Sequence, residues 1–106
     1  MPAEPSAAPF HDWNQRVDAE CYRPNAERGT LARISWNLGP TLASWLAEGD
    51  PATAARFVAD SRAAIAQPFH HSILPLASAA DRRTEIAWGI RDFEIRFGRR
   101  PAGIWL

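Results

Sequence analysis

The chain has 106 residues, enough for one domain, and its 12 acidic side chains balance 12 arginines, so the formal net charge is zero. This balance argues against the basic surface that nucleic-acid-binding proteins need, and no apolar run reaches the roughly 18 residues that cross a bilayer. The single cysteine, Cys21, excludes an internal disulfide, and the first residues lack the basic and apolar regions of a signal peptide. We therefore expect a cytoplasmic protein that binds neither nucleic acid nor membrane.

The first part of the chain predicts a lead-in followed by a short helix. Residues 1–10 hold three prolines and several alanines, which is typical of an extended segment. Apolar side chains four residues apart then predict a helix from about Trp13 to Tyr22, with Asp12 as its cap. Pro24 should end this helix.

The middle of the chain alternates between strand-like and helix-like segments. Residues 31–38 are rich in β-branched and aromatic side chains and suit a strand. Residues 41–48 predict a helix, and Gly49-Asp50-Pro51 has the glycine, cap and proline that end one helix and start the next, which should run to about Arg62. Residues 63–69 are ambiguous by periodicity, but their position after a helix favours a strand of about four residues.

The end of the chain predicts a long helix, a break and a buried strand. The helix has an apolar face at steps of four, three and four residues, formed by Ile86, Ile90, Phe93 and Phe97. Ser78 or Asp81 can cap its start, and Gly98 can end it. The apolar run 102–106 is then the last strand.

This order of strand, helices, strand, helix and strand predicts an α/β fold with parallel crossovers. A sheet of about three parallel strands leaves apolar strands with unpaired edges, each buried unpaired backbone group costing about 1–3 kcal/mol. We therefore expect the chain to be part of a larger sheet.

Two places near predicted strand ends offer candidate site residues. His70 and His71 follow the second strand, and a histidine there can hydrogen-bond a polar ligand or fill a structural role. Adjacent histidines with no acid nearby in the sequence argue against a metal site. Trp36 ends the first strand, where its ring can stack on a ligand or lie in the core. His11 and Asp12 can form a dyad, but no serine or cysteine in a suitable context accompanies them.

Four stretches of the sequence resemble, in order and spacing, the N-terminal part of glycoside hydrolase family 57: PFHDWNQRVDAECYRPNA, ISWNLGPTLASWL, IAQPFHHSILPLAS and RTEIAWGIRDFEIRFGRRPAGIWL. The likeness is greatest to bacterial α-amylase/α-mannosidase-like members with an extra C-terminal domain. The resemblance implies an incomplete seven-stranded (β/α) barrel that hydrolyses α-glycosides with retention, using a glutamate nucleophile and an aspartate acid/base. Residues 11–106 would be a partial parallel (β/α) barrel segment, about three strands with flanking helices.

The resemblance also assigns expected site residues. The family's Gly-x-Trp-Leu run precedes the nucleophile and matches residues 103–106, so the nucleophile is expected just after Leu106 and no catalytic residue lies in this chain. His71 matches a histidine of the family, whereas His70 stands where Asn or Tyr is expected. The expected substrate-binding residues are His71, Trp36, Trp105 and His11, with no metal and no cofactor.

The sequence thus predicts a fragment of a retaining glycoside hydrolase that acts on α-glucans or related α-glycosides and is inactive alone. Its partners would be an oligosaccharide or polysaccharide and the remainder of its own barrel. The alternative is a non-enzymatic α/β module that binds a partner or a sugar through the strand-end rim. The exposed apolar edge expected at Ile104, Trp105 and Leu106 argues against a free-standing module.

Overall fold

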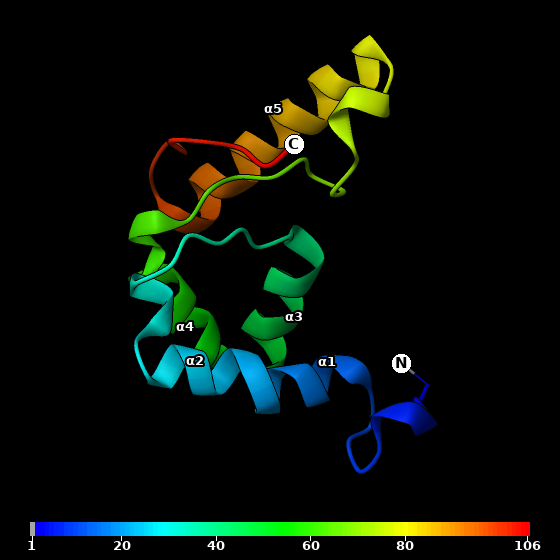
Figure 1. Ribbon diagram of the computed structural model, residues 1–106, viewed down its shortest axis with the longest axis vertical. Helices are drawn as coiled ribbons and strands as arrows, with labels where there is room; N and C mark the ends of the chain where they lie inside the picture. The colour runs from blue at the N-terminus through cyan, green and yellow to red at the C-terminus, as the bar shows by residue number, and fades with distance from the viewer. Residues whose placement is uncertain (1) are drawn as a thin grey trace.

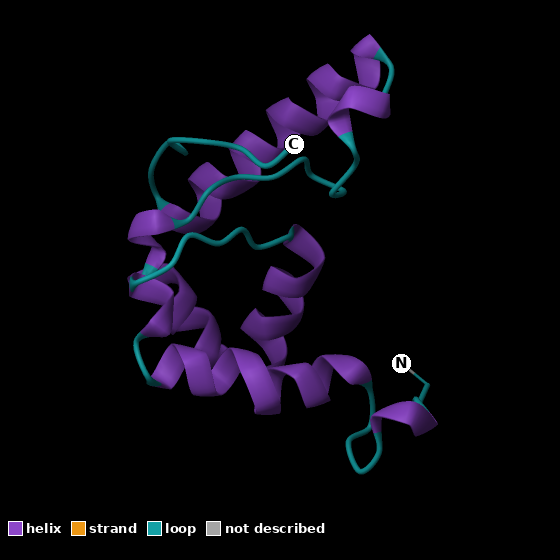
Figure 2. Cartoon of the chain, viewed as in Figure 1, coloured by secondary structure: helices purple, strands orange, loops and turns teal. Residues whose placement is uncertain are grey.

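The structure is a computed structural model that describes residues 2–106. This part of the chain is built from helices joined by loops, and it contains no β-strand (Figures 1 and 2). Three layers follow one another along the longest axis: a helical rod near the N-terminus, a helix pair, and a long C-terminal helix with extended chain beside it (Figure 1). The predicted α/β fold, and with it the partial (β/α) barrel, is therefore wrong.

The rod is one continuous helix made of three pieces: α1 (Trp13–Val17), the π-helical turn η2 (Asp18–Tyr22) and α2 (Arg23–Glu27). The predicted Asp12 cap is confirmed, because its side chain accepts a hydrogen bond from the Gln15 N–H at 3.0 Å. Before it, the predicted extended lead-in contains a 3₁₀ turn, η1 (Pro5–Ala7), while Met1 lies outside the described residues.

The predicted end of the helix at Pro24 is wrong, because a wider turn lets the helix continue. The Arg23 N–H donates to the Asp18 carbonyl, five residues back, in the π-helical pattern. Pro24 has no N–H to donate, and it directly follows this π-helical turn. The rod therefore continues to Glu27, three residues beyond Pro24.

The helix pair consists of α3 (Pro40–Gly49) and α4 (Pro51–Ala59). The Asp50 side chain caps α4 by accepting from the Thr53 N–H, as the Gly-Asp-Pro pattern predicted. α4 is shorter than predicted because the 3₁₀ turn η4 (Ser61–Ala63) follows it. Both helices pack on the rod through a core of Ala26, Leu31, Leu46 and Phe57.

The long helix α5 (Ala79–Phe97) confirms the prediction most fully. The Ser78 hydroxyl accepts from the Asp81 N–H at 3.1 Å, and Gly98 ends the helix in the left-handed conformation at φ 69°. Phe93, on the predicted apolar face of α5, is only 3% exposed. It forms a second hydrophobic core with Ala64 and Ala66. No helix in the described part of the chain is long and apolar enough to cross a membrane.

Extended chain takes the place of the predicted sheet. Three extended segments lie side by side next to α5 (Figure 1), joined by parallel bridges between Trp36 and Ala64 and between Ala66 and Ile104. Each bridge is isolated, so no ladder forms.

Two of the three predicted strands are shortened by 3₁₀ turns at their beginnings. Gly29, in the left-handed conformation, starts a 3₁₀ turn (η3, Thr30–Ala32) that takes the beginning of the first predicted strand. The turn η4 occupies the beginning of the second predicted strand. After the bridged residues Ala64 and Ala66 comes Pro68, which has no N–H to donate to a ladder. Only Trp36, Ala64, Ala66 and Ile104 form bridges among the described residues.

Candidate ligand pocket

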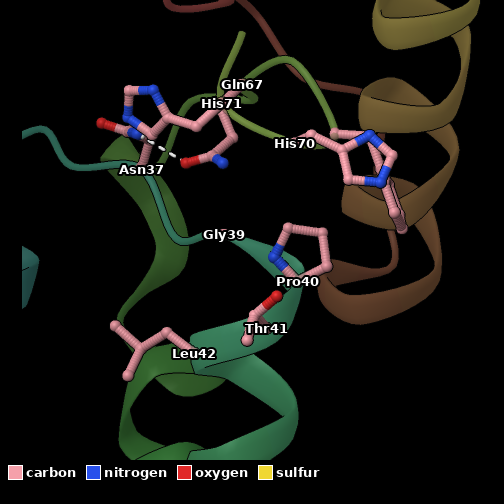
Figure 3. A pocket seen from close by; sticks show the side chains of 9 residues that line it. Asn37, Gly39, Pro40, Thr41, Leu42, Gln67, His70 and His71 are labelled. Carbon is pink, nitrogen blue, oxygen red and sulfur yellow. Dashed lines mark hydrogen bonds between the residues drawn. The ribbon is translucent and has the colours of Figure 1, made fainter. Parts of the chain in front are cut away.

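A pocket of about 540 Å³ opens between the start of α3 and the loop that follows the central extended segment (Figure 3). We call it the α3 pocket, and its lining consists of Asn37, Gly39, Pro40, Thr41, Leu42, Gln67, Phe69, His70 and His71. The two bridged segments bring these residues together, since one leads directly into α3 and the other into residues 67–71. The volume lies in the range of about 300–1,000 Å³ typical of small-molecule sites.

One wall is a pair of side-chain amides. Asn37 Nδ2 donates to Gln67 Oε1 at 2.8 Å, and Gln67, only 6% exposed, donates from Nε2 to the Pro68 carbonyl at 3.3 Å. Gly39 allows this arrangement, because a Cβ there would lie 3.0 Å from Gln67 Nε2. The pair is therefore fixed by packing before any ligand arrives.

The floor of the pocket is the first turn of α3. Its N-cap is Gly39, so no side chain caps the turn, and Pro40 occupies the first helical position. The first N–H groups of an α-helix have no partner within the helix. Those of Thr41 and Leu42 are thus available to an oxygen of a ligand.

His70 stands at the opposite side, held by Glu85 of α5. Glu85 accepts from the His70 backbone N–H at 2.8 Å, and its other oxygen lies 3.0 Å from His70 Nδ1 and 2.7 Å from the Ser72 hydroxyl. The bond from the His70 backbone is the main cause that lowers the pKa of Glu85, with burial opposing it and Ser72 and the His70 ring adding to it. With Nδ1 held by the carboxylate, Nε2 is the ring atom of His70 that remains for another hydrogen bond.

His71 lies on the same wall as the amide pair (Figure 3). Its backbone has a positive φ of 58°, which costs energy in any residue with a Cβ. The bond from its N–H to the Pro68 carbonyl, at 2.8 Å, closes a tight turn over residues 68–71. The turn separates the two histidines, so that their rings lie on different sides of the pocket.

The structure brings only one of the four expected substrate-binding residues, His71, to the described pocket lining. Trp36 lies in the core, with edge-to-face contacts to Phe57 and Phe97 at 5.0 and 5.7 Å and its Nε1 bonded to the Leu31 carbonyl. This placement favours the core role that the sequence left open for it.

The other two expected residues lie elsewhere. Trp105, 54% exposed, is on the last extended segment and does not line the pocket. His11 precedes the rod, where its Nδ1 is 2.9 Å from Asp12 Oδ2, so the dyad suggested by the sequence does form. Neither residue of this dyad lines the α3 pocket.

Sequence reasoning missed Gln67 and Glu85. Gln67 is in the quoted QPFHH stretch, but nothing in that stretch distinguishes a buried amide from an exposed one. Glu85 is 15 residues from His70 and falls on the helix among other charged side chains. Its only sequence signal is its place four residues before Gly89, on the helix face that meets residues 67–69.

The lining contains amides, imidazoles, a hydroxyl, backbone N–H groups and one aromatic ring, but no Asp or Glu. Among residues 2–106, no three His, Cys, Asp or Glu side chains are placed to hold a metal ion. Such a lining can bind a neutral, polyhydroxylated ligand. No protein-family model, curated protein or solved structure matches this chain.

Proposed function

We propose that this chain supplies a carbohydrate-binding pocket of a glycoside hydrolase similar to family 57, which acts on α-glucans or related α-glycosides. The observation that carries the proposal is the convergence of Asn37, Gln67 and His71 on one pocket of about 540 Å³. Amides and imidazoles can both donate to and accept from sugar hydroxyls. The resemblance independently assigns a sugar contact to His71.

Phe69 and the start of α3 complete this fit. The Phe69 ring gives the pocket an apolar surface of the kind that packs against the C–H face of a sugar, and it is held edge-to-face by Trp88 at 5.6 Å. The free N–H groups of the first turn of α3 can donate to hydroxyl oxygens on another side of the bound sugar. A sugar unit would thus meet donors on one side and an aromatic ring on another.

The chain alone should not hydrolyse glycosides. Retaining hydrolysis needs two carboxyl groups about 5–5.5 Å apart, and the described pocket lining has none. In this proposal the carboxylates come from another part of the enzyme. Incubation of the pure chain with maltotetraose should release no reducing sugar, and release of a product with retained anomeric configuration would contradict the proposal.

Replacing His71 with alanine should weaken maltotetraose binding about tenfold, because one hydrogen bond to a hydroxyl is worth about 1.5 kcal/mol or less. Titration calorimetry or NMR titration of the purified chain measures this change. His11→Ala is the matched control, since His11 is also exposed to solvent but lies next to the rod and does not line the pocket. Equal losses in both variants, or no binding by the wild-type chain, would overturn the proposed function.

A further inference from the structure

A cluster of three ionisable side chains joins the rod to the junction of α3 and α4, away from the α3 pocket. Asp18, in the π-helical turn, is 2% exposed. Arg23 NH2 donates to Asp18 Oδ2 at 3.3 Å, and Arg23 Nε donates to Asp50 Oδ2 at 2.9 Å. The Arg23 guanidinium thus donates hydrogen bonds to two carboxyl groups, one in the rod and one at the start of α4.

The two carboxyl groups are not equivalent. Both oxygens of Asp50 are bonded: Oδ1 accepts from the Thr53 N–H at 3.3 Å, and Oδ2 accepts from the Thr53 hydroxyl at 2.8 Å and from Arg23. By contrast, Asp18 Oδ1 is buried and has no hydrogen-bond partner among the described residues. A buried, unpaired oxygen is costly in an anion, whereas in a neutral carboxylic acid it is a weakly charged carbonyl oxygen. The surroundings therefore fit an ionised Asp50 and a protonated Asp18.

We propose that Asp18 keeps a proton and donates it in a hydrogen bond to Asp50, so that the pair forms a proton-dependent clasp between the rod and the N-terminus of α4. When the proton is lost, two neighbouring carboxylates share one arginine, and the rod is held less firmly. Loss of the Asp18 proton changes only the protonation and the hydrogen bonds of these side chains, and no covalent bond between heavy atoms forms or breaks.

The electrostatic surroundings agree with this arrangement. Burial raises the pKa of Asp18, the hydrogen bond and the charge of Asp50 raise it further, and Arg23 only partly offsets them, so that it reaches about 6. Burial also acts to raise the pKa of Asp50, but hydrogen bonds from Asp18, Thr53 and Arg23 outweigh it and hold that pKa well below its usual range.

Few other groups can respond to pH at this place. Tyr22, in the same turn, has a pKa raised mainly by burial and then by neighbouring negative charge, so it stays neutral in the relevant range. α3 contributes Trp45 and Gly49 to the adjoining pocket, and α1 contributes Gln15, all without charge. Two further charged side chains, Glu27 of α2 and Arg56 of α4, line a second pocket beside Arg23 and Asp50. Asp18 is therefore the group that titrates within the clasp between pH 5 and 7.5.

The direction of the pH effect follows from the raised pKa. The native state binds the Asp18 proton more tightly than the unfolded state, where the pKa is near 3.8. This contribution to stability is complete below about pH 3.8 and is lost as the pH rises through 6. The ionised Asp50 contributes in the opposite sense, and its part is lost only below about pH 4.

The test compares urea unfolding of the wild type and of Asp18→Asn at pH 5 and pH 7.5. An asparagine retains an N–H donor for Asp50 and has no proton to lose. The folded-to-unfolded ratio of Asp18→Asn, relative to wild type, should therefore rise about tenfold from pH 5 to pH 7.5. The three histidines are present in both proteins, so their titration cancels in this comparison.

Asp60→Asn is the control, because no side-chain hydrogen bond of Asp60 is found among the described residues; its pH profile should follow that of the wild type. Parallel profiles for Asp18→Asn and wild type would overturn the proposal. If Asp18→Asn does not fold, the ¹³C resonance of the Asp18 carboxyl in the wild type decides the question. A titration midpoint near 6 supports the clasp, and a midpoint at or below 3.8 overturns it.

Discussion

Gly89→Ala should destabilise the protein by about 3 kcal/mol, the upper end of the usual cost of overpacking a core. A Cβ at position 89 would overlap the Gln67 carbonyl oxygen and lie 3.3 Å from the Phe69 nitrogen. Both are backbone atoms, so no side-chain rotation can relieve the contact, and α5 must move away from residues 67–69. This movement would also strain the bond from the Phe69 N–H to the Glu85 carbonyl. Thermal unfolding should show a fall in Tm of about 12–24 °C.

Gly49→Ala is the control for this substitution. Gly49 also lies in a helix, but a Cβ there would only touch the Trp45 ring at an ordinary 3.5 Å. Alanine normally stabilises a helix relative to glycine by up to about 1 kcal/mol. Gly49→Ala should therefore leave Tm unchanged or raise it. Similar effects of the two substitutions would show that α5 does not pack on residues 67–69 as described.

Glu85→Gln should weaken maltotetraose binding more than tenfold and destabilise the fold by about 2 kcal/mol, because hydrogen bonds to a charged group contribute about 1.5–3 kcal/mol. The carboxylate, whose side chain is 12% exposed, accepts three bonds from His70 and Ser72. An amide has one acceptor oxygen fewer and cannot hold all three donors. The loop that carries both pocket histidines would then lose its anchor on α5.

The pH dependence of this variant provides a further check. The pKa of Glu85 is lowered, so its contribution to stability is complete above its usual value of 4.5 and is lost as the pH falls through the native-state pKa. The difference in stability between wild type and Glu85→Gln should therefore shrink below pH 4.5. Glu94→Gln serves as the control on the same helix, and it should change neither stability nor binding. Equal maltotetraose binding by wild type and Glu85→Gln would show that the Glu85–His70 contact does not contribute to ligand binding.

Local sequence signals predicted the helices because the determinants of a helix lie within a few residues of one another. Ser78 caps α5 through the N–H three residues later, and Gly98 ends it with its own backbone conformation. Asp50 caps α4 in the same local way. The one large boundary error is at Pro24. Proline normally ends a helix, but here a π-helical turn precedes it and the helix continues.

The predicted sheet failed because pairing of extended segments is decided by contacts that are distant in sequence. The strand-like composition around Trp36 and Ile104 does correspond to extended chain, and the bridges between segments are parallel. However, composition does not reveal where 3₁₀ turns shorten the segments. The same limit applies to Trp36, whose aromatic ring suits a ligand or a core equally well until Phe57 and Phe97 are placed around it.

The sequence by itself determined the helix boundaries at Asp50 and Gly98, limited the start of α5 to Ser78 or Asp81, and pointed to the histidine-containing stretch that lines the α3 pocket. Only the tertiary structure decided that Glu85 holds His70, that Gly89 must lack a side chain and that Asp18 is buried beside Asp50. A cap or a helical face requires partners within one or two turns, and these are legible in the sequence. A buried carboxyl group, a close backbone approach or a pocket wall depends on which distant segment packs against it, and that is fixed only when the whole chain is folded.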